Sequence, residues 1–512
     1  MKPLPLGIET FSKIIEEGYL YIDKTKEISQ LFGTGQYFFL SRPRRFGKSL
    51  LISALDAIFR GRKELFKGLY IYDKIEWKEY PVIRLDLSTC KNNTPENLEI
   101  SLNETLDKIA KQNSIELTSK FASGKFLDLI QKLSVKGKVA ILIDEYDKPL
   151  IDHLTNLEIA KANREILKDF YGMIKASDEF VKFAFITGVS KFSQVSIFSG
   201  LNNIRDISLL PEFSSLLGYT QEELENYFAD RIEMQMKESG VEKKEILEKL
   251  RLWCNGYSWD GKVRVYNPFS ILNYFQSKEF RNYWFESGTP TFLMNYIKEY
   301  KVEVPNIERA ELSSQILSSY NIENIQFESL LLQTGYLTIV NAENMNSGIL
   351  YTLDYPNEEV RLSFLTHIVS SFLNSKIHVG ELDPILWQMQ RALSQDNLDL
   401  FFKKLRALFA SIPYTLHLPY EAYYHSLFYM VLKLIGCKID LEVLSSKGRV
   451  DGILELEDKV YIIELKLERA EKAIEQIKDR KYADAYMNLG KRIILLGIGY
   501  LERELSYIKE EV

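Results

Sequence analysis

The chain has 512 residues, of which 46% are hydrophobic and 27% are charged, a composition typical of a globular protein with more than one domain. Its formal net charge of −6 gives no global sign of a nucleic-acid partner, so any basic binding surface must be local. Three widely separated cysteines argue against a disulfide framework or a zinc site, and no signal peptide or membrane span is apparent, so we expect a cytoplasmic protein without a membrane partner.

Residues 37–55, YFFLSRPRRFGKSLLISAL, predict a strand, a loop and a helix in succession. The loop ends in Gly47-Lys48-Ser49, like the phosphate-binding pattern G-x-x-x-x-G-K-[ST]. Arg42 stands where that pattern has its first glycine. A lone Gly-Lys-Ser is more often an ordinary helix start, so the interpretation as a nucleotide site depends on what the rest of the chain places beside it.

The residues between Arg42 and the glycine suggest how such a loop works. Pro43 fixes its own φ and favours an extended conformation at Arg42, which as an arginine cannot take a positive φ cheaply. Arg44 and Arg45 add positive charge, so we interpret the loop as one that attracts phosphates by its charge in place of the tight turn that a glycine allows. The alternative is that these arginines form ordinary surface pairs with acidic neighbours.

Short apolar segments separated by helical stretches follow the loop. The run at 37–40 and those at 80–88, 138–147 and 179–190 are dense in apolar residues, and 206–213 is the expected last strand. Almost wholly apolar strands alternating with helices indicate a parallel sheet that is covered on both faces. This is the setting that a phosphate-binding loop requires, because its helix begins at the carboxyl edge of a buried strand.

Polar residues at the ends of these strands complete a predicted nucleotide site. Asp144 would hold Mg²⁺, Glu145 would polarise the attacking water, and Thr187 would sense the γ-phosphate. Lys48 would reach the β- and γ-phosphates, while the Ser49 hydroxyl would be a second Mg²⁺ ligand. The residues predicted to bind the nucleotide are Arg44, Arg45, Phe46, Gly47, Lys48, Ser49, Leu50, Asp144 and Thr187.

The middle of the chain is predominantly helical. Thr220 followed by Glu223 predicts a capping box at a helix start. Residues 327–366 predict a helix, a hairpin and a second helix, which is compatible with a winged-helix-like module. Such a module can bind DNA, but we favour a role in packing between domains.

A second site is predicted from the segment 445–482. A hairpin turn centred on Glu457-Asp458 places Asp451 opposite Glu464, with Lys466 on the same face because strand side chains alternate. A loop with an odd number of residues would break this register, and a four-residue loop with the same centre fits better than a two-residue one. The resulting Asp…Glu-x-Lys arrangement is the PD-(D/E)XK pattern.

This pattern serves metal-dependent phosphodiester hydrolysis. Asp451 and Glu464 would hold Mg²⁺, which activates water, and Lys466 would position the nucleophile or stabilise developing charge. A surface salt-bridge ladder is the alternative, but Glu464 ends the apolar strand VYIIEL, where a carboxylate without a partner is costly. Gln476 follows on the next predicted helix.

Four segments outside the hairpin carry a family resemblance. RPRRFGKS, ILIDEYDKPL, TGVSKFSQVSIFSGLNNIRDIS and LPLGIETFSKIIEEGYLYIDKT resemble the bacterial AAA-ATPase-like proteins, in which an ATPase-like region is joined to a C-terminal PD-(D/E)XK nuclease-like domain. The family's loop reads R-P-R-R-F-G-K-S/T, so the missing glycine is its own pattern. In nuclease-like folds an acid from the helix at 419–436 completes the metal site, which makes Glu421 the candidate here.

The resemblance implies an α/β multidomain fold. A P-loop domain of the AAA/ASCE type with a parallel sheet is expected over 1–215, and a helical lid with a winged-helix-like region over 216–374. A PD-(D/E)XK nuclease-like α/β domain is expected over 375–512. AAA-type relatives often take an arginine from a neighbouring copy, so a homo-oligomer is a further expectation, with Arg205 or the loop arginines as candidates.

The sequence therefore predicts an ATPase that uses ATP and Mg²⁺ and is coupled to a nuclease-like domain. The expected polymer substrate is DNA rather than RNA, in defence or DNA processing. One alternative is an ATP-driven switch or scaffold whose C-terminal domain only binds nucleic acid or a protein partner. Another is a protein that binds nucleotide without turning it over.

Overall fold

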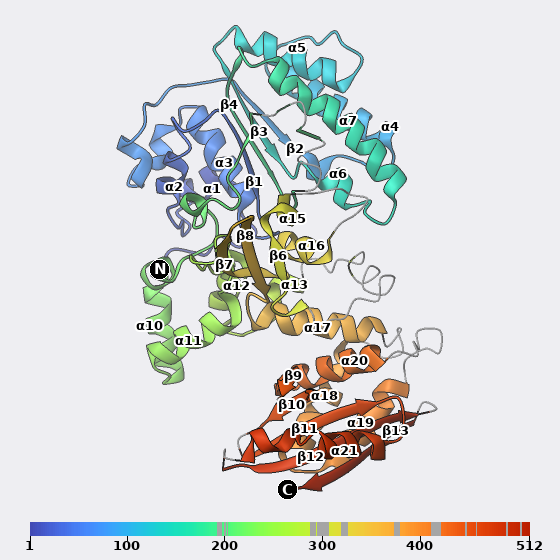
Figure 1. The fold of residues 1–512 in the computed structure, drawn as a ribbon. Helices are drawn as coiled ribbons and strands as arrows, with labels where there is room; N and C mark the ends of the chain where they lie inside the picture. Colours follow the sequence, from blue (N-terminus) through green and yellow to red (C-terminus); the bar gives the residue numbers. More distant parts are fainter. Residues whose placement is uncertain are drawn as a thin grey trace. The chain divides into compact units, whose positions relative to one another are not determined.

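A computed structural model describes most of the chain. The described residues are 1–191, 197–198, 201, 203–286, 293, 307–318, 326–372, 379–410, 421–445, 448–456, 458–487, 490–501 and 504–512, with the main chain alone at 372, 379–381, 410, 421–425, 438–445 and 448–450. The chain forms two compact units, one of Met1–Gly288 with Arg309–Val360 and one of Thr289–Glu308 with Arg361–Val512 (Figure 1).

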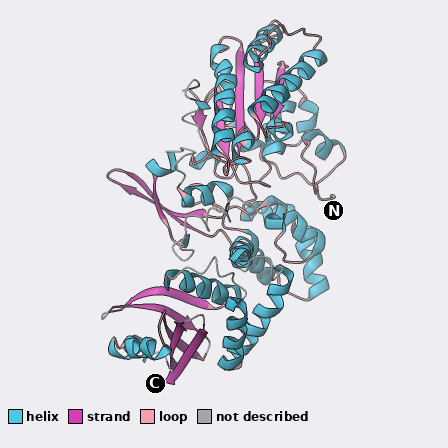
Figure 2. Ribbon diagram, turned by 90° about the vertical axis from the view of Figure 1, so that its right-hand side faces the viewer, coloured by secondary structure: helices cyan, strands magenta, loops and turns pink. Residues whose placement is uncertain are grey.

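The first unit is built on a parallel five-stranded sheet in the order β2-β3-β4-β1-β5 (Figures 1 and 2). Its strands are β1 (Tyr37–Ser41), β2 (Val82–Asp86), β3 (Val139–Asp144), β4 (Val181–Gly188) and β5 (Arg205–Asp206). Every residue of β1 and β3 is buried, as the apolar runs predict. Because β4 lies between β1 and β3, the loop after β1 and the acid that ends β3 flank the end of β4, which confirms the expected P-loop architecture.

Helices cover both faces of this sheet (Figure 1). On one face Phe39, Ile141 and Ile186 share a core with α4, α5 and α7. On the other face Phe59 of α3 lies 4.7 Å from the ring of Phe183. The helices of this region are α1 (Phe11–Glu16), α2 (Thr25–Ser29), α3 (Lys48–Phe59), α4 (Pro95–Gln112), α5 (Ala122–Ser134), α6 (Lys148–Ile151) and α7 (Leu157–Ala176).

The strand predicted over 206–213 is wrong in extent, because β5 ends at Asp206. The Asp206 carboxylate accepts a 2.9 Å hydrogen bond from the main-chain N–H of Ser208, which turns the chain out of the sheet. Pro211 then begins a short 3₁₀ turn, Pro211–Phe213. The hydrogen bond accepted by the Asp206 side chain and the position of Pro211 together explain why β5 ends earlier than predicted.

The helices that follow belong to the same unit. They are α9 (Gln221–Tyr227), α10 (Ala229–Ser239), α11 (Lys243–Cys254), α12 (Pro268–Ser277) and α13 (Tyr283–Glu286). The predicted capping box is confirmed, since Thr220 accepts from the N–H of Glu223 and Glu223 accepts from the N–H of Thr220. It fixes the start of α9.

The predicted helix, hairpin and helix over 327–366 are also confirmed. They are α16 (Phe327–Thr334), β7 (Thr338–Met345), β8 (Gly348–Asp354) and α17 (Glu358–Phe372), preceded by β6 (Glu311–Ser313) and α15 (Ser314–Ser318). The strands form a three-stranded sheet in the order β6-β8-β7. The boundary between the two units falls within α17, after Val360.

The second unit contains a mixed five-stranded sheet in the order β13-β12-β11-β10-β9. Its elements are α18 (Val379–Ser394), α19 (Leu398–Ala410), α20 (Glu421–Leu434), β9 (Lys438–Ser445), β10 (Gly448–Glu455), β11 (Lys459–Lys466), α21 (Ala470–Asp479), β12 (Arg492–Leu501) and β13 (Glu504–Glu511). Ile474 of α21 packs with Ile462 on one face, and Phe402 of α19 stacks 4.1 Å from Tyr507 on β13. Strand β13 was not anticipated. Among the described residues, no helix combines the length and apolar character of a membrane span.

Candidate functional site

The loop after β1 takes its shape from two residues with positive φ. Arg45 has φ 67° and Gly47 has φ 92°, and α3 begins directly after Gly47. No atom of the described residues lies within 4 Å of a Cβ added at Gly47, so its backbone conformation, not lack of space, favours glycine there. The first turn of α3 leaves unpaired N–H groups beside the loop, and such groups bind anions.

Lys48 lies inside this loop with its ammonium turned onto the loop's own main chain. Its Nζ donates hydrogen bonds of 3.0 Å to the carbonyl oxygens of Arg42 and Pro43. Burial lowers the pKa of Lys48, and the nearby carboxylates, Asp144 first, oppose that shift. The ammonium is therefore desolvated and positioned where a phosphate oxygen would be a better acceptor than either carbonyl.

The two predicted residues at the ends of β3 and β4 meet in the structure. The hydroxyl of Thr187 donates a 2.6 Å hydrogen bond to Asp144, and both side chains are buried. Glu145 adopts φ 50°, a strained conformation, and its N–H donates to the Asp144 carboxylate at 3.0 Å. Burial raises the pKa of Glu145, which suits a group that accepts a proton.

Asp147 is a buried acid in the same turn to which sequence reasoning gave no role. It accepts from the N–H of Val189 at 3.1 Å and from the N–H and hydroxyl of Ser190 at 2.6 Å each. The hydroxyl of Tyr146 donates to the carbonyl of Ser190 at 3.0 Å. These bonds fasten the turn after β3 to the turn after β4. The third acid in Asp-Glu-Tyr-Asp was the signal that could have revealed it.

The three loop arginines lie in different environments. Arg42 is 1% exposed, and its guanidinium binds main-chain carbonyls and lies 4.3 Å from the ring of Trp259, so it is not a phosphate-facing charge. Arg44 and Arg45 are exposed, and neither forms an ion pair with an acid in the part of the chain that is described. Arg45 lies over Phe269 at 4.8 Å.

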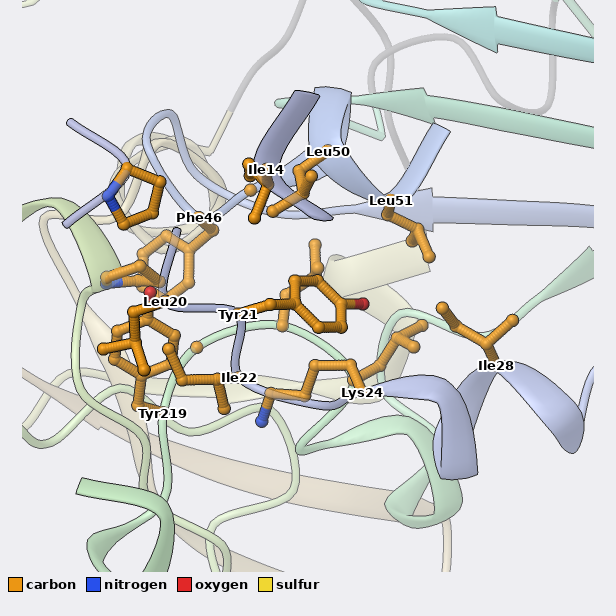
Figure 3. Close-up of a pocket in the computed structure, with 16 residues that line it drawn as sticks. Ile14, Leu20, Tyr21, Ile22, Lys24, Ile28, Phe46, Leu50, Leu51 and Tyr219 are labelled. Carbon is orange, nitrogen blue, oxygen red and sulfur yellow. The ribbon is translucent and has the colours of Figure 1, made fainter. Parts of the chain in front are cut away.

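An apolar hollow lies beside the loop and α3 (Figure 3). Phe46 and Leu50, both predicted nucleotide contacts, line it together with Leu20 and Ile22 from the N-terminal segment and Tyr219 from the start of the helical region. Apolar walls next to a phosphate-binding loop suit a flat aromatic base. Sequence reasoning missed the contribution of the N-terminal segment, which only the fold brings to the loop.

A buried lysine joins the two walls of this hollow. Lys24 lines it, and its ammonium donates to the carbonyl of Ser215 at 2.9 Å and pairs with Glu223 at 2.6 Å. Burial lowers the pKa of Lys24, and Glu223 opposes that shift. Glu223 also closes the capping box of α9, so one carboxylate ties the N-terminal segment to that helix.

Ser49 follows Lys48 in α3 and is half-buried, and Arg205 lies on β5. Arg205 donates to the carbonyl of Thr34 at 3.4 Å within its own unit. The roles predicted for Ser49 as a metal ligand and Arg205 as an arginine offered to a neighbour stay predictions.

The register predicted for the C-terminal hairpin is confirmed. Gly452 pairs with Ile463 in the antiparallel ladder of β10 and β11, which places Asp451 opposite Glu464. The N–H of Leu456 donates to the carbonyl of Lys459 at 2.8 Å next to the turn. Ile453 and Ile462 belong to the core beneath α21, so alternation puts Asp451, Glu464 and Lys466 on that same face.

Hydrogen bonds join these side chains into one cluster. Asp451 accepts a 2.9 Å bond from the N–H of Leu465. Glu464 is completely buried and accepts from Lys466 at 3.1 Å and from the amide of Gln476 on α21. The predicted catalytic residues of the hairpin and Gln476 therefore converge at one place.

The charge balance of this cluster is unfavourable for two carboxylates. Burial first, and then the charge of Asp451, raise the pKa of Glu464 to about 7, although Lys466 opposes them. A divalent cation between two such oxygen donors would remove their repulsion, so the donor set fits Mg²⁺. No cluster of three or more His, Cys, Asp or Glu side chains occurs within the described ranges. Glu421, the third predicted ligand, begins α20, but its side chain lies outside those ranges.

Two glycines that sequence reasoning missed bring α21 close to the cluster. Gly497 and Gly499 on β12 lie beside Glu464 and Lys466 in the parallel ladder. A Cβ at Gly497 would lie 2.6 Å from Ile474 and 2.8 Å from the carbonyl of Ala470. Glycine is therefore required for the close approach that brings Gln476 to Glu464. The spacing Gly-Ile-Gly in an apolar strand was the available signal.

A buried tyrosine also adjoins this cluster. Tyr482 is 3% exposed, and burial, followed by the charge of Glu464, raises its pKa. It follows α21 in the chain and was not considered from the sequence.

Comparisons with known proteins agree with an ATPase-like N-terminal region and a nuclease-like C-terminal region. Residues 5–198 match the family model described as "Predicted AAA-ATPase", and residues 419–510 match that of the PD-(D/E)XK nuclease superfamily. The "Uncharacterized protein in vnfD 5'region" of Azotobacter chroococcum mcd 1 is 39% identical over 519 residues, covering 99% of this chain and 98% of that protein. These matches indicate ATPase-like and nuclease-like chemistry.

Proposed function

Because the chain belongs to the AAA-ATPase-like family that carries a C-terminal PD-(D/E)XK nuclease superfamily domain, we propose that it hydrolyses ATP and cleaves DNA. The observation that carries the proposal is the convergence of Asp451, Glu464, Lys466 and Gln476 on one face of the β10–β11 hairpin. Two carboxylates and an ammonium at one place suit phosphodiester hydrolysis better than they suit a structural role, since burying them is costly.

ATP would bind with its phosphates on the loop after β1. The N–H groups around Gly47 and the first turn of α3 would hold phosphate oxygens, and the Lys48 ammonium would exchange its two carbonyl acceptors for the β- and γ-phosphates. Ser49 and Asp144 would hold Mg²⁺, which offsets phosphate charge. The adenine base would lie in the apolar hollow lined by Phe46 and Leu50.

Hydrolysis of ATP needs a water aligned with the γ-phosphate. Glu145 follows Asp144 directly, and its raised pKa favours proton acceptance from that water. Thr187 donates to Asp144 and so restrains its orientation, and it would report the presence of the γ-phosphate. The hydrogen bonds of Asp147 keep the two turns in register during this step.

In the C-terminal cluster Asp451 and Glu464 would hold Mg²⁺, which supplies an activated water and charge stabilisation. Lys466 would place its ammonium against the developing negative charge on the scissile phosphate. Gln476 holds the Glu464 carboxylate in its orientation. The domain division at 1–215, 216–374 and 375–512 and a homo-oligomeric assembly are parts of the same proposal.

The test measures phosphate release and nucleic-acid cleavage in one preparation with Mg²⁺ or Mn²⁺. Wild type, Lys48→Met and Asp451→Asn would be given supercoiled plasmid, linear duplex DNA and a matched RNA. We expect Asp451→Asn to lose DNA cleavage and keep ATP hydrolysis, and Lys48→Met to lose ATP hydrolysis. ATP hydrolysis without cleavage of any substrate would favour the alternative of an ATP-driven switch.

A further inference from the structure

Arg42 departs from the usual phosphate-loop pattern, and its side chain is anchored to the end of β1 and to the segment after β5. Its Nη1 donates to the carbonyls of Ser41 at 2.9 Å and Ser208 at 2.7 Å, and its Nη2 donates to the carbonyl of Phe213 at 3.2 Å. All three acceptors are main-chain atoms. The guanidinium therefore fixes the path of the chain after β5 relative to the end of β1.

The flat face of the same guanidinium rests on an aromatic ring. Trp259 lies 4.3 Å from it, and Phe46 of the loop contacts the Trp259 ring edge-on at 5.7 Å. Burial is the main cause that lowers the pKa of Arg42, while the carboxylates of Asp206 and Asp260 oppose it. The Arg42 guanidinium is thus surrounded by main-chain carbonyls, an aromatic face and, at longer range, two carboxylates.

The main chain of Arg42 in turn positions Lys48. The Arg42 carbonyl accepts from the Lys48 ammonium at 3.0 Å, and the Arg42 N–H donates to the carbonyl of Gly188 at the end of β4 at 3.1 Å. A shift of the Arg42 peptide would move both the acceptor of Lys48 and the start of the loop. The side chain of Arg42 therefore anchors the same residue whose main-chain groups position Lys48 and the start of the loop.

We infer that Arg42 is a positioning residue for nucleotide binding, which holds the loop in its phosphate-accepting form by anchoring it to the segment after β5 and to Trp259. It replaces the conformational freedom of a glycine with a side chain that locks one conformation. The inference rests on the proposed ATPase function. Because the Arg42 guanidinium is buried on main-chain carbonyls, we assign it no contact with the nucleotide.

The test compares Arg42→Lys with Arg264→Lys in the full chain. Arg264 is a matched control, because its guanidinium also donates to two main-chain carbonyls, those of Gly256 at 3.1 Å and Val340 at 3.2 Å, neither of which belongs to the loop. Lysine keeps the charge but cannot reproduce the planar fork. The readouts are the dissociation constant of a fluorescent ATP analogue and the kcat and KM of phosphate release, below the melting temperature of each variant.

We expect Arg42→Lys to raise the dissociation constant and KM at least tenfold, and Arg264→Lys to leave both within twofold. Trp259→Leu is the second variant, for use if Arg42→Lys does not fold, because it removes the stacking face and leaves the hydrogen bonds of Arg42. We expect it to raise the dissociation constant and KM at least threefold. If Arg42→Lys or Trp259→Leu folds and binds the ATP analogue as tightly as wild type, the inference about Arg42 is overturned and the proposed function still stands. Absence of nucleotide binding by wild type would overturn the proposed function as well.

Discussion

Thr187 donates a 2.6 Å hydrogen bond to Asp144 across the neighbouring strands β4 and β3. Both side chains are buried, and this bond directly restrains Asp144, the acid proposed to hold Mg²⁺, against β4, the strand between β3 and β1. Any change at Thr187 therefore acts on the orientation of Asp144.

Replacing Thr187 by valine keeps its shape and removes its hydroxyl. The buried Asp144 carboxylate would lose a donor, which costs about 1–3 kcal/mol. We expect kcat for ATP hydrolysis to fall roughly tenfold, the equivalent of about 1.4 kcal/mol, with a smaller change in KM. Steady-state phosphate release checks this, with Thr187→Ser as the control that retains the hydroxyl. Equal kcat values for the valine and serine variants would show that the hydrogen bond has no part in catalysis.

Lys48→Met separates ligand binding from stability. Its ammonium is buried, and burial lowers its pKa, so the charged form is disfavoured in the folded state. We expect methionine to abolish ATP binding while leaving the melting temperature unchanged or slightly higher. Nucleotide binding and thermal unfolding would be measured beside Lys67→Met, which alters an exposed lysine. A large loss of stability would mean that the two carbonyl contacts of Lys48 matter more than its desolvation.

Gly497→Ala tests whether the close approach of α21 builds the nuclease-like cluster. The added Cβ would meet Ile474 at 2.6 Å and the carbonyl of Ala470 at 2.8 Å, an overpacking that costs about 1–3 kcal/mol. Cleavage should fall at least tenfold because Gln476 moves from Glu464. Gly172→Ala is the control, since its added Cβ has no neighbour within 4 Å in the described part of the chain. A variant with full cleavage would show that the site does not depend on this packing.

Asp396 pairs with Lys459 and Arg492 at the turn end of the hairpin, and these ion pairs predict a pH dependence of stability. Hydrogen bonds from Lys459 and then Arg492 hold the pKa of Asp396 well below its usual range. Its stabilising contribution is therefore complete above the unfolded pKa of about 3.9 and disappears as the pH falls through the lower folded value. Asp396→Asn should destabilise the second unit at pH 7, by about 1 kcal/mol because Asp396 is partly exposed.

Amide exchange of β11 and β12 at pH 7 measures that effect, with the strands of the first-unit sheet as an internal reference. Urea titrations between pH 2 and pH 7 then follow the difference between wild type and Asp396→Asn. The difference should shrink below about pH 4. A difference that is constant over the whole range would mean that the charge of Asp396 is not what stabilises the hairpin.

Local patterns were sufficient for the elements whose causes are local. The hairpin register followed from its turn centre, because a single choice of turn fixes which residues face each other. The buried strands β1 and β3 followed from their apolar runs, and the start of α9 followed from its capping box. The last strand of the sheet was predicted over 206–213, whereas β5 ends at Asp206. Pro211, a residue that interrupts strands, was visible in that segment.

The role of Arg42 could not be predicted in the same way. An arginine beside a phosphate-binding loop suggests an exposed charge, and its burial depends on carbonyls of Ser208 and Phe213 and on the ring of Trp259. These groups are distant in sequence and meet only in the folded unit. The N-terminal wall of the apolar hollow was missed for the same reason.

The most direct test of the whole account is the initial rate of plasmid cleavage with ATP, with ADP, with a non-hydrolysable ATP analogue and without nucleotide. Wild type and Lys48→Met would be compared at fixed Mg²⁺, with Asp451→Asn as the blank. We predict that the wild-type rate changes at least threefold with the nucleotide and that Lys48→Met gives one rate throughout. Equal wild-type rates under all four conditions would contradict the coupling between the ATPase and the nuclease-like domain that the sequence predicts.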